Sequence, residues 1–252
     1  LIVIDDGSKD NSPQIIQKLS QKYGFEFIHR PNKGLSATLN EGIKLSKGKY
    51  WSVCASDDVL THDKIDRQVR FMENNPDYGM CYGKVVLFNE KGLNTPLNIK
   101  YSRGGWIFDD LIKGRFWIPA VSNLIKKDVF LDVGYYDEEL WVEDWDMWVR
   151  ISHKYQIGFI NEYIAKYRQH DSNISKQGWK LYEAKKASLL KWERLENYDE
   201  IIRLWQLRWF RALSRNYKKE ARKYIPLAIR NIYHINSIIG FVKYFFTKKD
   251  IE

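Results

Sequence analysis

The sequence predicts an α/β fold with a mainly parallel sheet flanked by helices, followed by a helical C-terminal extension. In the first half, runs of strand-forming residues alternate with segments of about 10 to 15 residues with helical spacing, which is typical of parallel sheets with right-handed crossovers. The charge also divides the chain, because residues 1–175 hold 23 Lys and Arg against 24 Asp and Glu, whereas residues 176–252 hold 18 against 8. We therefore expect one α/β domain over 1–175 and a basic, aromatic helical extension over 176–252.

Apolar periodicity and turn residues place the elements in order. A strand at 1–4 leads to a helix capped by Asn11 or Ser12, because Pro13 suits the first helical turn. Thr61 is the expected cap of a later helix. The other expected elements are strands at 25–30, 49–54, 79–88, 157–160 and 163–168, and helices at 35–46, 61–75, 143–155 and throughout the segment from 176. Residues 89–143 are irregular and rich in aromatic residues.

Composition narrows the class of protein. The 252 residues are 44% hydrophobic and 15% aromatic, which is enough for a sizeable core and excludes global disorder. Cys54 and Cys81 lie in apolar runs without metal-ligand spacing, so we expect reduced core thiols and no disulfide framework. No apolar run reaches the roughly 18 residues that span a bilayer. The chain opens on the strand-like LIVI without a start methionine, so we expect its natural N-terminus to be absent.

Two pairs of carboxylates follow predicted strands. Asp5 and Asp6 end the LIVI strand, and Asp57 and Asp58 follow the strand KYWSVC. Ligands of parallel α/β sheets bind beyond the carboxyl ends of the strands, so both acidic loops should line one edge. Each loop could also be an ordinary turn, because Asp, Gly and Ser are common turn residues. The functional alternative is a nucleotide contact for the first pair and a Mg²⁺ or Mn²⁺ site for the second.

The stretch EDWDMWVR predicts a helix with acidic residues in its first turn. Glu143 and Asp144 could act only as helix caps favoured by the dipole, with Asp146 pairing with Arg150 four residues later. A carboxylate at a rigid helix start could also remove a proton from a sugar hydroxyl stacked on nearby tryptophans. Spacing alone leaves both alternatives open. His170, in YRQH, is either a surface residue, a diphosphate contact or an additional metal ligand.

Six motifs in order extend this interpretation: LIVIDDGSKDNS, NKGLSATLNEGI, SDD, VGYYDEEL, EDWDMWVR and YRQH. Taken together, they make residues 1–175 resemble the family 2 glycosyltransferases, which have the GT-A fold. The resemblance implies an inverting transferase that moves a sugar from a nucleotide diphosphate donor, usually a UDP-sugar, to an acceptor hydroxyl. It also implies a setting in cell-surface polysaccharide or lipopolysaccharide synthesis, in the cytoplasm or peripherally on the inner face of the cell membrane, with a glycan or lipid-linked acceptor.

The resemblance also implies roles for particular residues. Asp6 matches the uracil contact, Asp57 lies nearer the ribose, Asp58 is the expected ligand of Mg²⁺ or Mn²⁺, and Asp144 matches the general base. The full expected donor site is Asp5, Asp6, Ser8, Asn32, Gly34, Asn40 and Asp57. The expected metal site is Asp58, Asp57 and His170. The expected acceptor site is Trp141, Glu143, Trp145 and Asn123.

Three departures from the family pattern affect these expectations. Ala55 stands where many members have the first carboxylate of the metal motif, and Leu39 stands where an Arg often precedes Asn40. The family's first strand, which lies inside the sheet, is not in this chain. These departures keep open a second function, a protein of the same fold that binds a nucleotide sugar without turnover.

The basic extension allows further alternatives. Ile201, Trp205, Trp209 and Leu213 recur at helical spacing between basic residues. This stripe could pack on the core or lie on an anionic membrane surface. The net charge of +9 would also suit a nucleic-acid-binding protein, but the excess is confined to the extension and no nucleic-acid-binding motif is present, so we expect no nucleic-acid partner.

Overall fold

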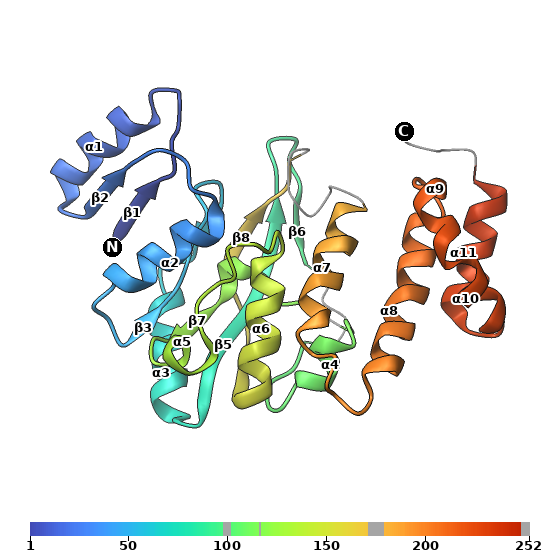
Figure 1. Cartoon of the computed structure of the whole chain (residues 1–252). Coiled ribbons are helices and arrows are strands. Elements are labelled where there is room, and N and C mark those ends of the chain that lie inside the picture. Colours follow the sequence, from blue (N-terminus) through green and yellow to red (C-terminus); the bar gives the residue numbers. More distant parts are fainter. Residues whose placement is uncertain (98–101, 116, 171–178, 248–252) are drawn as a thin grey trace. The chain divides into compact units, whose positions relative to one another are not determined.

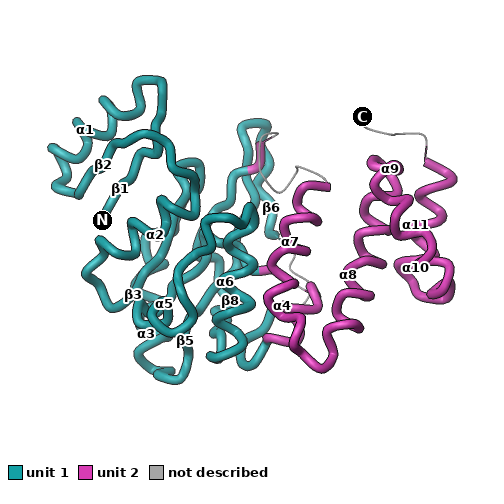
Figure 2. Tube along the Cα trace, viewed as in Figure 1, with its two compact units in different colours: residues 1–98, 102–107, 118–168 teal, residues 99–101, 108–117, 169–252 magenta. Residues whose placement is uncertain are grey.

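The computed structural model describes residues 1–97, 102–115, 117–170 and 179–247. They form two compact units, shown in Figures 1 and 2, and each is considered by itself. The first unit takes its described residues from 1–98, 102–107 and 118–168, and the second from 108–117 and 169–252. The second unit therefore includes a short helix from the middle of the chain. The predicted boundary between residues 175 and 176 lies outside the described residues.

A small parallel sheet opens the first unit. β1 (Ile2–Asp5) pairs with β2 (Glu26–His29), and α1 (Ser12–Tyr23) connects them. Pro13 lies in the first turn of α1 as the sequence predicts, and Gly24 ends the helix with a φ of 70°. α2 (Leu35–Leu45) follows β2. The sequence therefore predicts this βαβα segment to within two residues.

The larger sheet combines one long parallel pairing with several short antiparallel ones. Its strands are β3 (Tyr50–Trp51), β4 (Val59–Leu60), β5 (Tyr78–Phe88), β6 (Asn94–Pro96), β7 (Leu124–Lys126) and β8 (Gln156–Arg168). Their order is β3-β7-β5-β8-β4, and β6 pairs with β5. Only β5 and β8 run parallel among these described pairs. The antiparallel pairings involve strands of two or three residues, which are too short for a periodic signal.

The two sheets are separate within the described residues, because no strand pairs β1 with β3. The expectation of a further strand between them stays a prediction. α2 instead links the small sheet to the rest of the unit. The Lys127 ammonium group donates to the carbonyl of Ser46 at the end of α2, and the Lys44 ammonium lies 5.3 Å from the centre of the Tyr135 ring.

Helices α3 (Lys64–Asn74), α5 (Val129–Val133) and α6 (Glu143–Lys154), and the 3₁₀ helix η1 (Ala120–Ser122), complete the first unit. α3 begins at Lys64, because the expected cap Thr61 instead bonds the carbonyl of Ile164 through its N–H and hydroxyl. β8 is one strand of 13 residues where the sequence predicts two.

One cluster of the core of the first unit lies between α3 and the larger sheet. Its buried residues include Met72, Cys81, Leu124 and Ile160. Cys81 is therefore a core thiol as expected, whereas Cys54 is exposed and corrects the expectation for that residue.

The second unit is helical in its described residues. It consists of α4 (Phe108–Ile112), α7 (Lys180–Leu190), α8 (Tyr198–Leu213), α9 (Lys218–Ala221), η3 (Arg222–Tyr224), α10 (Ile225–Arg230) and α11 (Ile235–Phe246). The predicted stripe of Ile201, Trp205, Trp209 and Leu213 on α8 is buried. The Trp205 indole N–H donates to the carbonyl of Ile112 over 2.7 Å. Of the two alternatives for this stripe, packing inside the protein or lying on a membrane surface, the structure therefore supports packing.

Helices long and apolar enough to cross a bilayer are absent from the part of the chain that the structure describes.

Two glycines of the first unit should respond oppositely to a methyl group. A Cβ at Gly79 in β5 would lie 2.7 Å from Cβ and Cγ of Tyr155, so Gly79→Ala should lower the free energy of unfolding by about 1 to 3 kcal/mol. A Cβ at Gly42 inside α2 would meet only Cδ1 of Ile4 at 3.7 Å. Gly42→Ala should therefore raise stability by about 0.5 to 1 kcal/mol through helix propensity. Urea unfolding of both variants measures the difference, and equal effects would contradict this packing.

Candidate functional site

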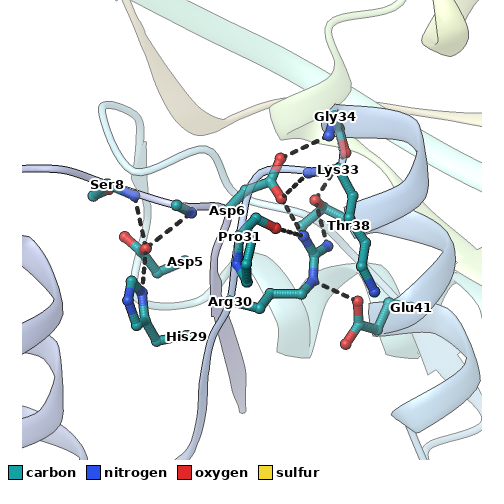
Figure 3. A network of polar contacts seen from close by, with 11 residues as sticks. Asp5, Asp6, Ser8, His29, Arg30, Pro31, Lys33, Gly34, Thr38 and Glu41 are labelled. Carbon is teal, nitrogen blue, oxygen red and sulfur yellow. Dashed lines mark hydrogen bonds and ion pairs between the residues drawn. The ribbon is translucent and has the colours of Figure 1, made fainter.

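The DDGS loop is organised by Asp5 at the end of β1 (Figure 3). Its carboxylate accepts hydrogen bonds from the N–H groups of Gly7 and Ser8 at 3.1 and 3.0 Å and contacts Nδ1 of His29 at 2.8 Å. The hydrogen bond from the Ser8 side chain is the largest influence and, with these contacts, lowers the pKa of Asp5 to about 2 against the opposing effect of burial. Asp5 thus stays ionised and holds the loop, and direct contact with a donor stays a prediction.

Asp6 points to the loop that precedes α2. Its two oxygens accept the N–H groups of Lys33 at 2.9 Å and Gly34 at 3.0 Å, and the carboxylate pairs with Arg30 (Figure 3). Burial, the largest single influence, raises the pKa of Asp6, but the bonds from Lys33, Arg30 and Gly34 outweigh it and the pKa falls. Asp6 is therefore an ionised, fixed group whose contact with a nucleobase remains a prediction.

Arg30 fixes this loop from the other side. Its Nε donates to Glu41 at 2.8 Å, and its Nη2 donates to the hydroxyl of Thr38 at 2.9 Å (Figure 3). Both partners lie on α2, so the guanidinium joins the end of β2 to this helix and to Asp6. Arg30 was not among the predicted site residues. Its position at the end of a predicted strand, opposite an acidic loop, is the signal that could have identified it.

Glycine brings the two loops into contact. Gly7 has a φ of 89°, and a Cβ on it would lie 2.7 Å from the backbone nitrogen of Asn32. Any larger residue would therefore push the loops apart. The structure thus places four of the predicted donor residues, Asp6, Ser8, Asn32 and Gly34, on two adjoining loops.

Asn40 has a different place from the one that the donor site implies. It is buried on α2, its Nδ2 donates to the Tyr136 carbonyl and to Glu138 at 2.9 Å each, and its Oδ1 accepts the Tyr136 N–H at 2.9 Å. Both amide hydrogens are therefore used within the protein. In this structure Asn40 positions the loop between α5 and α6, and a donor contact stays a prediction.

The second acidic loop closes on the end of β8. Asp58 Oδ1 accepts the N–H of Arg168 at 2.9 Å, and Arg168 Nε donates to the carbonyl of Asp57 at 2.8 Å. Asp57 and Asp58 are both partly exposed. Arg168 thus fixes the loop by main-chain and side-chain bonds, a role that sequence analysis missed because the two partners lie 110 residues apart.

The carboxylate oxygens of this loop are suitable ligands for a divalent cation. Mg²⁺ usually binds one or two carboxylates and completes its shell with water and substrate phosphates, which Asp57 and Asp58 could provide for. Groups of three or more His, Cys, Asp or Glu able to hold a metal are absent from the described residues. The third predicted ligand, His170, belongs to the second compact unit and stays a prediction.

Behind the acidic loop lies a buried lysine. Lys64 at the start of α3 is fully buried and donates to the Ser52 hydroxyl at 2.6 Å and the Asn123 carbonyl at 2.9 Å. Burial lowers the pKa of Lys64 to about 8. Sequence analysis missed this residue, although Lys64, Gln68 and Met72 share one buried face at a spacing of four. Lys64 links α3 to the segment before the acidic loop and to the residue that precedes β7.

Asn123 corrects a sequence prediction. Its side chain is 0% exposed, and its Nδ2 donates to the Ala120 carbonyl at 2.6 Å, so it cannot present its amide to an acceptor sugar in this structure. Its Oδ1 is buried without a hydrogen-bond partner.

The acidic pair at the start of α6 lies in a buried environment. Burial, followed by the negative charge of Asp144, raises the pKa of Glu143 to about 7. The fully buried Tyr136 lies close enough that both carboxylates, after burial itself, raise the pKa of its hydroxyl. Asp144 Oδ1 also accepts the N–H of Trp145 at 2.6 Å. The environment therefore favours a proton on Glu143 near neutral pH beside the charge of Asp144.

Arg150 holds the start of α6 in place. It pairs with Asp146 at 2.8 Å, as the sequence predicts, and donates to the carbonyls of Val133, Gly134 and Tyr135 at 2.6 to 3.1 Å. The loop between α5 and α6 is thus tied to the helix that it precedes.

The two tryptophans of the predicted acceptor site differ in exposure. Trp141 is 36% exposed and can contact an acceptor. Trp145 is 1% exposed, so it is a core residue and the predicted acceptor contact is corrected. A helical period places Trp145 on the same face as Trp148 and Val149, which are both buried, and this pattern could have identified it as core.

Comparison with known proteins places this geometry in a family. The family model described as "Glycosyl transferase family 2" matches residues 1–134. An uncharacterized glycosyltransferase from Rickettsia felis is 30% identical over 189 residues, which cover 70% of this chain and 30% of that protein. The poly-beta-1,6-N-acetyl-D-glucosamine synthase of Staphylococcus epidermidis is 30% identical over 149 residues, or 57% of this chain and 36% of the synthase. The chain thus spans about a third of the length of these two relatives.

Solved structures confirm the predicted α/β fold of the GT-A type. TarS from S. aureus in complex with UDP-GlcNAc aligns with a TM-score of 0.64 at 15% identity, covering 96% of this chain and 79% of the TarS chain. A mannosyltransferase from Pyrobaculum calidifontis in complex with GDP-Man and Mn²⁺ aligns with a TM-score of 0.60 at 11% identity, covering 97% and 77%.

The buried lysine should make stability depend on pH. Between about pH 8 and pH 10.5 the folded protein releases the Lys64 proton while the unfolded chain keeps it, so stability should rise with pH in this window. Lys64→Met removes this contribution. The wild type should therefore gain about 3 kcal/mol relative to the variant between the two ends of the window, measured by urea unfolding. Parallel pH profiles for the two proteins would contradict a buried ammonium.

The Arg150 contacts should matter more than a surface pair of the same spacing. Arg150→Met leaves the carboxylate of Asp146, which is 0% exposed, without its cation, so stability should fall by about 3 to 5 kcal/mol. Arg70→Met removes an exposed pair with Asp66, also four residues apart, and should change stability little. Asp146→Asn combined with Arg150→Met should recover part of the loss. Equal losses in the two single variants would show that Arg150 is only a surface partner.

Proposed function

Because the chain belongs to glycosyl transferase family 2, we propose that it moves a sugar from a nucleotide diphosphate donor to an acceptor hydroxyl with inversion at the anomeric carbon. The observation that carries this proposal is the half-buried acidic pair at the start of α6, where the charge of Asp144 lies beside a Glu143 whose pKa is raised to about 7. Two carboxylates in unlike environments are suited to proton transfer.

In the proposed reaction, Asp144 accepts the proton of the acceptor hydroxyl. The hydroxyl oxygen then forms a bond to the anomeric carbon, while the bond to the leaving nucleoside diphosphate breaks on the opposite face. A single displacement of this kind inverts the anomeric centre. Exposed Trp141 offers an aromatic face for the acceptor, and Glu143 offers a hydrogen bond to it.

The donor would lie along the two loops that Asp6 joins. We propose that Asp6, Ser8, Asn32 and Gly34 contact the nucleoside, with Asp57 near the ribose. Similar proteins support a UDP-sugar as donor, because TarS was solved with UDP-GlcNAc and the Staphylococcus epidermidis relative is a poly-N-acetylglucosamine synthase. N-acetylglucosamine is therefore the first sugar to test.

The cation proposed for this reaction is Mn²⁺ or Mg²⁺, held by Asp58 and Asp57 with His170 as a further candidate ligand. The mannosyltransferase with a similar fold was solved with Mn²⁺. When bound, a divalent cation would offset the negative charge that develops on the leaving diphosphate.

The acceptor and setting are also proposals. A glycan or lipid-linked acceptor would suit synthesis of a cell-surface polysaccharide, the product class of the Staphylococcus epidermidis relative. Such a reaction would take place in the cytoplasm or at the inner face of the cell membrane.

A donor panel with two matched variants tests the proposal. UDP-GlcNAc, UDP-Glc, UDP-Gal and GDP-Man are incubated with the purified protein, Mn²⁺ or Mg²⁺ and candidate acceptors, and release of the nucleoside diphosphate is measured. Asp144→Asn should lower kcat by about 10² to 10⁴ fold while nucleotide binding measured by calorimetry is kept. Asp58→Asn should weaken the metal-dependent part of that binding.

Asp77→Asn is the control, because Asp77 is an exposed carboxylate between α3 and β5. It should leave both activity and binding unchanged. Full turnover in Asp144→Asn would exclude Asp144 as the base, and unaltered metal dependence in Asp58→Asn would exclude the proposed metal site.

A binding protein without turnover is the second candidate. Ala55 occupies the position of the first carboxylate in the metal motif, and the described residues lack a group of three metal-ligating side chains. In this case calorimetry would detect nucleotide-sugar binding, whereas no nucleoside diphosphate would be released with any acceptor.

A further inference from the structure

The helix α11 packs in the second unit with small and polar residues on its inward side. α11 packs against α8 (Figure 1), and its buried residues are Asn236, Ser237 and Gly240. A Cβ on Gly240 would lie 2.5 Å from ring carbons of Phe210, so glycine permits the close approach of the two helices. Arg211 on α8 donates to Oδ1 of Asn236 at 3.2 Å. Phe241 and Tyr244 also pack on the Phe210 ring, with ring centroids 4.9 and 6.5 Å from it. The inward side of α11 thus combines small and polar residues with two partly buried aromatic rings.

Other apolar residues of α11 lie on the opposite side. Ile235, Ile238, Val242 and Phe245 are spaced by three, four and three residues, so they share one face, which we call the outer face of α11. Their exposed fractions lie between 45% and 68%. The neighbouring Tyr233 and Phe246 are more exposed still. An uninterrupted apolar face of this kind on a globular domain indicates an interaction surface.

The sequence around α11 is rich in basic residues and poor in acidic ones. Residues 201–247 contain ten Lys and Arg but one acidic residue, Glu220. Burial, then the charges of Arg211 and Arg215, lowers the pKa of Lys243 on α11. Within the described residues, no carboxylate forms an ion pair with Arg211, Arg215 or Lys243. The cations beside α11 therefore repel one another and would be stabilised by an anionic surface.

These observations favour one occupant. We propose that the outer face of α11 lies flat on an anionic lipid surface, with its apolar side chains at the level of the acyl chains and Arg215 and Lys243 at the headgroups. Interfacial helices combine an apolar face, aromatic residues and flanking cations in this way. A second copy of this chain would place like charges opposite each other, which opposes self-association through this face. The inference does not depend on sugar transfer.

This surface differs from the one that the sequence predicts. The stripe of Trp205 and Trp209 on α8 is buried and cannot reach a membrane, whereas α11 has the exposed apolar side chains. Sequence alone does not separate the two helices, because both carry apolar residues at helical spacing. Only the packing of α11 in the structure distinguishes them.

Vesicle sedimentation tests the proposal. The whole chain, without nucleotide, is mixed with vesicles of phosphatidylcholine or of phosphatidylcholine with about 30% phosphatidylglycerol, at about 0.1 M and about 0.5 M salt. Binding should occur on the anionic vesicles and fall at the higher salt concentration. Ile238→Ser combined with Phe245→Ser should weaken it at least about tenfold by loss of apolar contact. Arg215→Gln combined with Lys243→Gln should weaken it and remove its salt dependence.

Leu131→Ser is the matched control, because Leu131 is 76% exposed but lies on α5 in the first unit. It should bind anionic vesicles like the wild type. Thermal unfolding of every variant checks that the fold is kept, since all five positions are at least partly exposed.

Absence of wild-type binding to anionic vesicles would overturn the proposal, as would full binding of the Ile238→Ser and Phe245→Ser double variant. A wild-type dimer in gel filtration that this double variant dissolves would assign the face to self-association instead. Absence of sugar transfer in a protein that still binds the vesicles would count against the proposed reaction and leave the membrane proposal unaffected.

Discussion

The side chain of Asn40 is the tie on which the arrangement of the first unit depends. It exchanges two hydrogen bonds with the backbone of Tyr136, much as one strand residue does with its partner, and links α2 to a loop 96 residues later. This link matters because β1 and β2 have no strand pairing with the larger sheet within the described residues. The loops with the candidate donor residues and the helix with the candidate base are therefore held together by a buried amide and its neighbours on α2.

The difference between local signals and contacts with distant segments explains which parts of the fold the sequence predicts. Elements with a strong local signal are predicted well, such as α1 with Pro13 in its first turn and α6 with its acidic start. The short antiparallel strands β3, β4 and β7 are fixed instead by pairing with distant segments, and two or three residues carry no period. The mixed sheet could not be inferred for this reason. Likewise, the local sequence pattern at residues 161 and 162 does not show that β8 continues through them.

The residues of the candidate site also differ in whether the sequence alone can identify them. Carboxylates at strand ends and at a helix start can be identified from residue type and place, and the structure finds Asp5 and Asp6 at the end of β1 and Asp144 at the start of α6. The strand predicted over 49–54 ends at Trp51, so Asp57 and Asp58 lie in a loop directly before β4 and not at the carboxyl end of a strand. The partners of these carboxylates, Arg30 and Arg168, cannot be identified in this way, because these residues lie on segments whose approach to the acidic loops only the tertiary structure defines. A sequence motif also does not show whether a side chain is buried. Trp145 lies within a motif and Asn123 in the irregular segment before it, yet both side chains belong to the core.

The second unit shows how packing can reverse the meaning of an apolar pattern. On α8 the apolar side is buried, and its hydrophobic contacts stabilise the unit. On α11 small and polar residues share the inward side with Phe241 and Tyr244, so the helix packs closely against Phe210 and accepts a bond from Arg211. Ile235, Ile238, Val242 and Phe245 nevertheless stay exposed. Those side chains remain available to an environment outside the unit. Because the surrounding charge is almost all positive, an anionic lipid surface satisfies both the apolar and the electrostatic requirement at once.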